Sequence, residues 1–89
     1  MCPKCEGFAA RIEIKHPLEI HRLVGEIEQV LAEGTLAFAG GNCSLSDIRP
    51  DRPWPQDYIE QAYRCPACEQ RFQLSVETYH GSGGSWDAA

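Results

Sequence analysis

Two short motifs of the same form carry the residues of this sequence that are best suited to chemistry. Each is a Cys-Pro-x-Cys unit, here called a knuckle, and together they contain Cys2, Cys5, Cys65 and Cys68. Two residues between the cysteines let a tight turn direct both sulfur atoms at one ion, and proline stiffens that turn. We therefore predict one zinc ion held by all four thiolates, with iron as a metal that the same ligand set could hold.

A zinc site of this composition is predicted to be structural. Sulfur fills all four positions, so no position remains for a water molecule or a substrate. We therefore expect a protein that is not an enzyme. The fifth cysteine, Cys43, would need a nearby base to act as a nucleophile, and His21 and His80 are the candidates. A packed side chain without a chemical role is the simpler interpretation of Cys43.

A thiol–disulfide redox protein is one alternative, because a Cys-x-x-Cys pair can be a dithiol of lowered pKa. That activity requires the first cysteine to lie at the N-terminus of a helix inside a βαβ unit. The residues on both sides of the second knuckle instead have the pattern of strands. We therefore favour metal binding over redox chemistry.

The elements that must position the knuckles begin with a strand and a helix. Residues 10–15 alternate apolar and charged side chains, which is the pattern of a strand with one buried face. Apolar residues then recur at the three- and four-residue spacing of an amphipathic helix. They are Leu18, Ile20, Leu23, Val24, Ile27, Val30 and Leu31. With Pro17 suited to the first helical position and Gly34 to the residue after the last turn, we predict a helix over about residues 17–33.

The second half of the chain is predicted to be mostly strand and loop. A short strand is expected at residues 35–39. The proline-rich segment at about residues 40–57 is expected to be a long loop that is either functional or packed by its own side chains. Residues 58–64 and 70–79 are predicted to form a hairpin whose turn is the second knuckle. The glycine- and serine-rich residues 81–89 are predicted to be a flexible tail.

These elements predict a single α+β domain at residues 1–80. It would combine a small antiparallel sheet of three to four strands with one amphipathic helix and the four-cysteine clip. A chain of 89 residues buries only about 60–65% of the surface that its unfolded form exposes, so a further clamp is expected. A structural metal ion would supply it.

The two knuckles and their flanking strands resemble the zinc-ribbon group, in which knuckles at the tips of β-hairpins hold one zinc ion. The resemblance rests on Cys2-Pro3-Lys4-Cys5 and Cys65-Pro66-Ala67-Cys68, while the predicted helix and the proline-rich loop depart from a minimal ribbon. It implies a metal site and leaves the partner open, because zinc ribbons bind nucleic acids, assemble proteins or serve as structural clips. The chain also has a more general likeness to small bacterial immunity proteins that neutralise toxins.

The charge of the chain bears on its partner. Thirteen acidic and eight basic residues give a formal charge of −5, which disfavours binding to a phosphate backbone. We expect a basic protein partner, and an inhibitor or immunity protein against a cytosolic toxin would be one form of this function. The predicted contact residues are Glu19, Glu26 and Glu33 on the helix and Trp54 and Tyr58 near the loop. A nucleic-acid-binding regulator is the alternative, and it would need the basic residues to gather at the metal end.

The sequence also predicts the compartment. No apolar run approaches the roughly 18 residues that a membrane span needs, and the first residues lack the apolar core of a signal peptide. We therefore expect a cytoplasmic protein that has no contact with a membrane. Thiols are kept reduced in that compartment, which favours metal ligation over disulfides.

Overall fold

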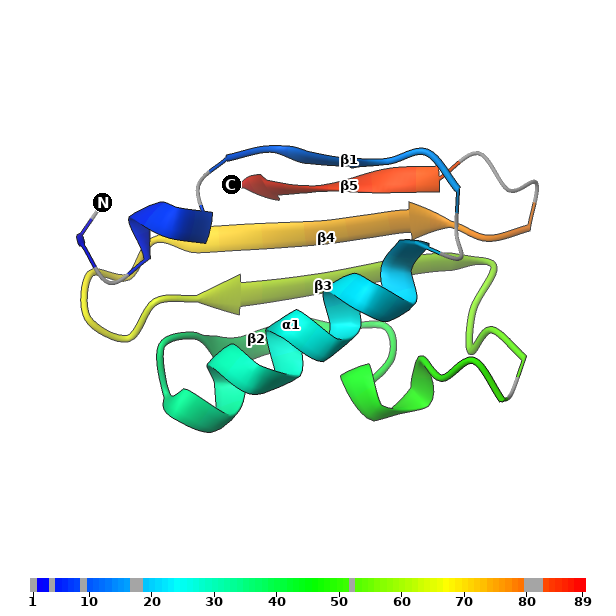
Figure 1. The fold of residues 1–89 in the computed structure, drawn as a ribbon, viewed down its shortest axis with the longest axis horizontal. Coiled ribbons are helices and arrows are strands. Elements are labelled where there is room, and N and C mark those ends of the chain that lie inside the picture. Colours follow the sequence, from blue (N-terminus) through cyan, green and yellow to red (C-terminus); the bar gives the residue numbers. More distant parts are fainter. Residues whose placement is uncertain (1, 4, 9, 17–18, 52, 80–82) are drawn as a thin grey trace.

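The computed structural model describes residues 2–3, 5–8, 10–16, 19–51, 53–79 and 83–89 (Figure 1). These residues form an α-helix layered on one face of an antiparallel sheet, so the predicted α+β class is confirmed. In chain order the elements are η1 (Glu6–Phe8), β1 (Ile12–Ile14), α1 (Ile20–Glu33), β2 (Ala37–Gly41), η3 (Leu45–Asp47), β3 (Tyr58–Arg64), β4 (Arg71–Glu77) and β5 (Gly83–Ala88). Here η marks a short 3-10 helix.

The sheet has the strand order β1-β5-β4-β3-β2, and every neighbouring pair is antiparallel. β3 and β4 form a hairpin that is paired from Tyr58–Glu77 to Arg64–Arg71, and the second knuckle makes its turn. β1 from the start of the chain pairs with β5 from its end, with Ile12 opposite Trp86. This pairing brings the first knuckle to the end of the sheet where the β3–β4 turn lies (Figure 1).

α1 covers part of the sheet with its apolar stripe. Ile20, Leu23, Val24 and Ile27 are buried against the sheet. The helix ends at Glu33, as predicted, and is capped by Gly34, whose φ of 80° is left-handed and whose N–H donates to the carbonyls of Leu31 and Val30. The predicted start at residue 17 falls on residues outside those described, and the observed helix begins at Ile20. No helix in the described part of the chain has the length and apolar character needed to cross a membrane.

The C-terminal segment corrects the prediction of a flexible tail. Residues 83–88 form β5, which lies between β1 and β4, so the sheet has five strands and the domain extends past residue 80. Trp86 is only 2% exposed and stacks on Phe72 with ring centroids 5.5 Å apart. Gly84 lies so close to β4 that a Cβ there would overlap the Ser75 carbonyl oxygen. The glycines therefore allow the strands to pair closely. From composition alone, the same glycines predict a flexible segment.

The segment between β2 and β3 is ordered by its own contacts. β2 extends to Gly41, two residues beyond the predicted strand, because Asn42 continues the pairing through its N–H to the Glu60 carbonyl. Leu45 and Ile48 are buried, and the Arg49 guanidinium donates to both carboxylate oxygens of Glu28 on α1 at 3.0 and 2.8 Å. The long loop is thus packed by its own side chains and joined to α1 by the Arg49–Glu28 pair. It begins after Gly41, where β2 ends, and not at residue 40 as predicted.

Candidate metal centre

Each knuckle is a turn held by backbone hydrogen bonds. In the first knuckle the N–H groups of Cys5 and Glu6 both donate to the Cys2 carbonyl, at 3.2 and 3.1 Å. In the second, Cys65 donates to the Gln70 carbonyl at 2.9 Å and accepts from the N–H of Glu69 at 2.8 Å. These bonds fix the backbone on both sides of the site, so the sulfur atoms are positioned by the turns themselves.

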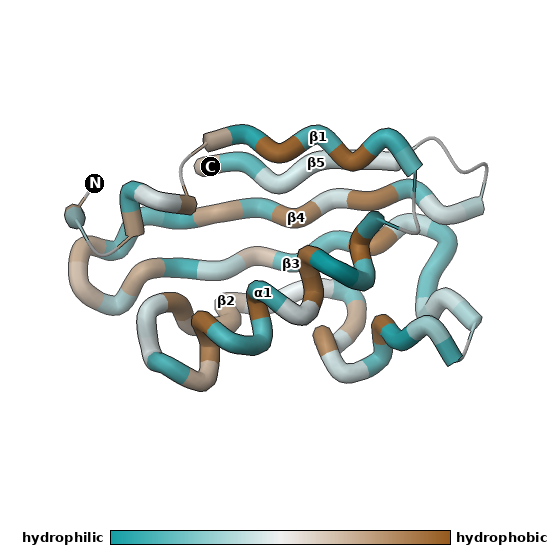
Figure 2. Tube along the Cα trace, viewed as in Figure 1, coloured by the Kyte–Doolittle hydropathy of each residue, from teal (hydrophilic) through white to brown (hydrophobic). Residues whose placement is uncertain are grey.

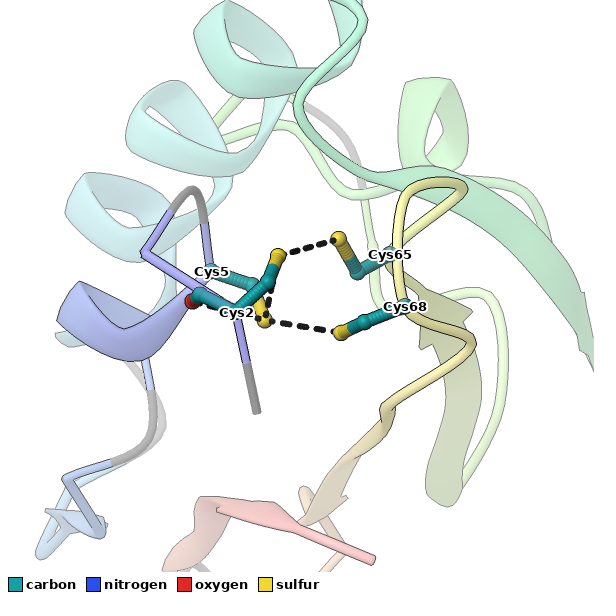
Figure 3. A group of neighbouring side chains, drawn as sticks. All are labelled: Cys2, Cys5, Cys65 and Cys68. Carbon is teal, nitrogen blue, oxygen red and sulfur yellow. Dashed lines mark hydrogen bonds between the residues drawn. The ribbon is translucent and has the colours of Figure 1, made fainter.

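The four sulfur atoms converge on one point between the two turns (Figure 3). The Sγ atom of Cys2 lies 3.8 Å from that of Cys5 and 3.6 Å from that of Cys65. The Sγ atoms of Cys5 and Cys68 are 3.5 Å apart. All four atoms lie within 4.8 Å of one another. A tetrahedron of sulfur atoms about 2.3 Å from a central ion has edges of about 3.8 Å. The spacing therefore matches four ligands around one ion.

The same distances exclude disulfides within the cluster. A disulfide joins sulfur atoms at about 2.05 Å, and all four cysteines are free thiols. The predicted ligands Cys2, Cys5, Cys65 and Cys68 are thus brought together in a group that could hold a metal ion. This is the part of the sequence prediction that the geometry supports.

The cluster is buried on its inner side. Cys5 and Cys65 have no exposed surface and belong to the hydrophobic core, whereas Cys2 and Cys68 are half-buried at its edge. The inner thiols have apolar surroundings, and a bound cation would compensate the cost of burying their thiolates. The donor set and its burial therefore fit a closed, sulfur-only site.

Two of the thiols differ strongly in acidity. Burial raises the pKa of Cys5 to about 12. The backbone N–H groups of Gln70 and Cys2 lower the pKa of Cys68 to about 6, because they donate to its sulfur and stabilise the thiolate. Cys68 therefore ionises more readily than Cys5, and Cys5 has to lose its proton to solvent when a cation binds.

The remaining candidates for thiol chemistry lie apart from this cluster. Cys43 is half-buried, its sulfur accepts from Gln61 Nε2 at 3.6 Å, and burial raises the pKa of its thiol. His21 stacks on Trp54 with ring centroids 5.1 Å apart, and His80 lies outside the described residues. Within the cluster, Cys65 lies between two strands and not at a helix N-terminus, as predicted. A raised pKa at Cys43 is the opposite of what an activated nucleophile requires.

The predicted partner-binding residues fall into three separate places. Glu19, Glu26 and Glu33 are exposed and lie along one side of α1 and the residue before it. Trp54 is half-buried against the core beside His21. Tyr58 is exposed on the other face of the sheet, since its neighbour Ile59 is buried towards α1. Trp54 and Tyr58 are therefore not brought together in one contact surface.

Two features of the site carry no signal in the sequence. Glu69 follows the second knuckle with a φ of 68°, and the described residues hold no other non-glycine residue with a positive φ. Gln70 supplies the N–H group that stabilises the Cys68 thiolate. A backbone conformation and a backbone donor depend on the turn and not on side-chain type, so residue types alone could not reveal them.

Comparisons with protein-family models, with curated proteins and with solved structures find no match to this chain. The assignment of a candidate metal site therefore rests on the geometry of the four cysteines themselves.

Proposed function

We propose that the four-cysteine cluster binds one zinc ion with a structural role. The observation that carries this proposal is the spacing of the four sulfur atoms, 3.5–3.8 Å along the measured edges. Zinc prefers tetrahedral thiolate ligands and imposes no other geometry, which suits a site built from two turns. With four sulfur ligands the ion has no open position for catalysis.

A zinc ion here would join two distant parts of the chain. The first knuckle precedes β1 at one edge of the sheet, and the second is the turn of the β3–β4 hairpin. Linking Cys5 to Cys65 closes a loop of roughly 60 residues, and in the chain-entropy description such a link stabilises a fold by about 4 kcal/mol. This is a large share of the stability expected for a domain of this size, so the ion would act as the clamp of the fold.

We further propose that the clamped domain is a protein-binding module for a basic partner. Three exposed glutamates, Glu19, Glu26 and Glu33, follow one side of α1, and the chain carries a formal charge of −5. A negative field of this kind attracts a basic protein and raises its association rate. An inhibitor or immunity protein that neutralises a basic cytosolic toxin is a concrete form of this function.

A nucleic-acid-binding role has less support. The Arg11 guanidinium pairs with Asp87 at 2.9 Å, and Arg64 lies 3.6 Å from Glu69. These acids offset the positive charge that a phosphate backbone would need near the metal end. Lys4 lies outside the described residues.

Capture from a host lysate tests the protein-binding function. Immobilised zinc-loaded protein is incubated with lysate at low salt, and bound proteins are identified and then washed at rising salt. The proposal expects a basic protein that is released between about 0.1 and 0.5 M salt, since screening weakens exposed charge pairs. Absence of a basic protein that binds in a salt-dependent manner would refute the function.

A further inference from the structure

An apolar groove runs along the side of α1 that faces β1. Two hollows, of about 360 and 410 Å3, lie side by side and share Ile12, Leu23 and Glu26, so they form one continuous groove. Its apolar lining includes Phe8, Val30 and Trp86. Ile12 lies in the groove with 43% of its surface exposed, although its strand partner Trp86 is buried.

The groove exists because one helix is too narrow for this sheet. Five strands about 4.8 Å apart place the outer strands about 19 Å from each other, whereas a helix with its side chains is about 10–12 Å wide. Figure 1 shows α1 lying over β2 and β3, while β1 and β5 remain beside it. Figure 2 shows hydrophobic positions along β1, of which Ile12 is exposed and Ile14 is buried. This difference in width leaves Ile12 of β1 exposed beside α1, while Ile14 of β1 and Trp86 of β5 are already buried.

The rim of the groove is acidic. Glu19 and Glu26 line one hollow, and Glu26 and Glu33 line the other. Because these residues recur every seven positions, they are about 10.5 Å apart along the helix. Arg22 also lines the rim, where its Nε lies 3.8 Å from Glu26 Oε1, so the row keeps an excess of negative charge.

We propose that this groove binds a basic amphipathic α-helix of a partner protein. The inference rests on the protein-binding function proposed above and assigns its contact surface. A helix beside α1 has the same rise per residue, so lysines or arginines every seven positions would meet Glu19, Glu26 and Glu33 in turn. Its apolar side chains would cover Ile12, which is exposed, and Phe8 and Val30, which are partly buried, as an amphipathic helix does in a hydrophobic groove.

Two other occupants fit less well. The α1 helix of a second copy would bring its own glutamates against the acidic rim, and like charges disfavour that contact. An extended segment could instead pair with the free edge of β1. That strand has only three residues, and Arg11 and Lys15 flank it, so a basic segment would be repelled there.

A designed peptide tests the groove directly. The probe is a fluorescent 18-residue peptide of leucine, alanine and lysine with lysines seven residues apart, titrated into the zinc-loaded full chain while anisotropy is recorded. We expect saturable binding that Glu26→Lys and Ile12→Asp each weaken at least tenfold. Glu60→Lys is the matched control, because Glu60 is exposed on β3 facing away from α1, and it should change the affinity less than twofold.

Further arms identify the occupant. A peptide with glutamate in place of lysine, and a second with a central proline that breaks the helix, are both expected to bind at least tenfold more weakly. Circular dichroism of each protein variant shows whether its fold is kept, and Glu26→Lys changes only an exposed side chain. Lack of binding to the wild type, equal binding to Ile12→Asp, or full binding of the proline peptide would overturn the groove assignment.

The outcome is separable from that of the proposed function. If the lysate yields a basic partner that Ile12→Asp still captures, the groove is wrong and the function stands. If the peptide binds in the groove but the lysate yields no basic partner, the groove stands and the function falls.

Discussion

The sulfur atoms of Cys5 and Cys68 lie 3.5 Å apart although 63 positions separate them in the sequence. Cys5 belongs to a turn near the start of the chain, and Cys68 belongs to the turn between β3 and β4. The contact exists because β1 and β5 are neighbours in the sheet, which places both turns at one end of the molecule. The candidate metal centre therefore depends on the sheet topology and joins the start of the chain to the β3–β4 turn.

Loss of one buried ligand should release the metal and destabilise the fold. Cys65→Ser is expected to lower the free energy of unfolding by several kcal/mol, because it removes both a buried ligand and the closed loop. The matched control is Cys43→Ser, which leaves the cluster intact and should retain the full metal content. Thermal melting with bound-metal measurement compares the two variants. Equal metal content in Cys65→Ser and Cys43→Ser would contradict the assignment.

The turn after the second knuckle stores backbone strain at Glu69. A left-handed φ of 68° costs a non-glycine residue about 1–2 kcal/mol, and glycine adopts it freely. Glu69→Gly is therefore expected to stabilise the protein by up to about 1 kcal/mol, since its pair with Arg64 at 3.6 Å is exposed and weak. Urea unfolding of the zinc-loaded protein measures the change. A loss of stability in Glu69→Gly would show that the side chain matters more than the backbone.

Replacing glycine with alanine should have opposite effects at a crowded position in β5 and at an open position in α1. Gly84→Ala should destabilise the fold by about 3 kcal/mol, because the new Cβ overlaps the Ser75 carbonyl on β4. Gly25→Ala, in open space on α1, should instead add up to about 1 kcal/mol through helix propensity. Denaturant unfolding of both variants provides the comparison. A neutral Gly84→Ala would mean that residues 83–88 are not part of the sheet.

The ion pair between the β2–β3 connection and α1 predicts a pH dependence. The Arg49 guanidinium, bound to both oxygens of Glu28, holds the pKa of that carboxyl below its usual value. A depressed folded-state pKa adds stability above the unfolded value of about 4.3, and this stability is lost as the pH falls through the folded pKa. Arg49→Gln should raise the Glu28 pKa and destabilise the protein at pH 7, with a difference that narrows below about pH 4. NMR titration of Glu28 together with melts at several pH values checks this, and an unchanged Glu28 pKa would speak against the pair.

Sequence patterns predicted the parts of this fold whose signal lies in side-chain types. The amphipathic period predicted α1, and alternation around the second knuckle predicted the β3–β4 hairpin. The Cys-Pro-x-Cys spacing predicted the four residues that the fold brings together at the metal centre.

The remaining features depend on contacts between distant segments. Gly83 and Gly84 indicate flexibility when read alone, whereas their role is to let β5 approach β4 and the end of β1 closely. The groove beside α1 follows from the number of strands relative to the width of one helix. Because residues 83–88 have the composition of a tail, residue types alone do not predict β5 or the groove beside it.

Metal analysis of the freshly purified native protein tests the central claim most directly. Inductively coupled plasma mass spectrometry of the desalted protein, with thiol titration in parallel, measures bound metal and free thiols per chain. The four-cysteine clip predicts about one zinc per chain with four thiols protected until the metal is chelated. A zinc content near zero in a folded protein with all its thiols reduced would contradict the claim.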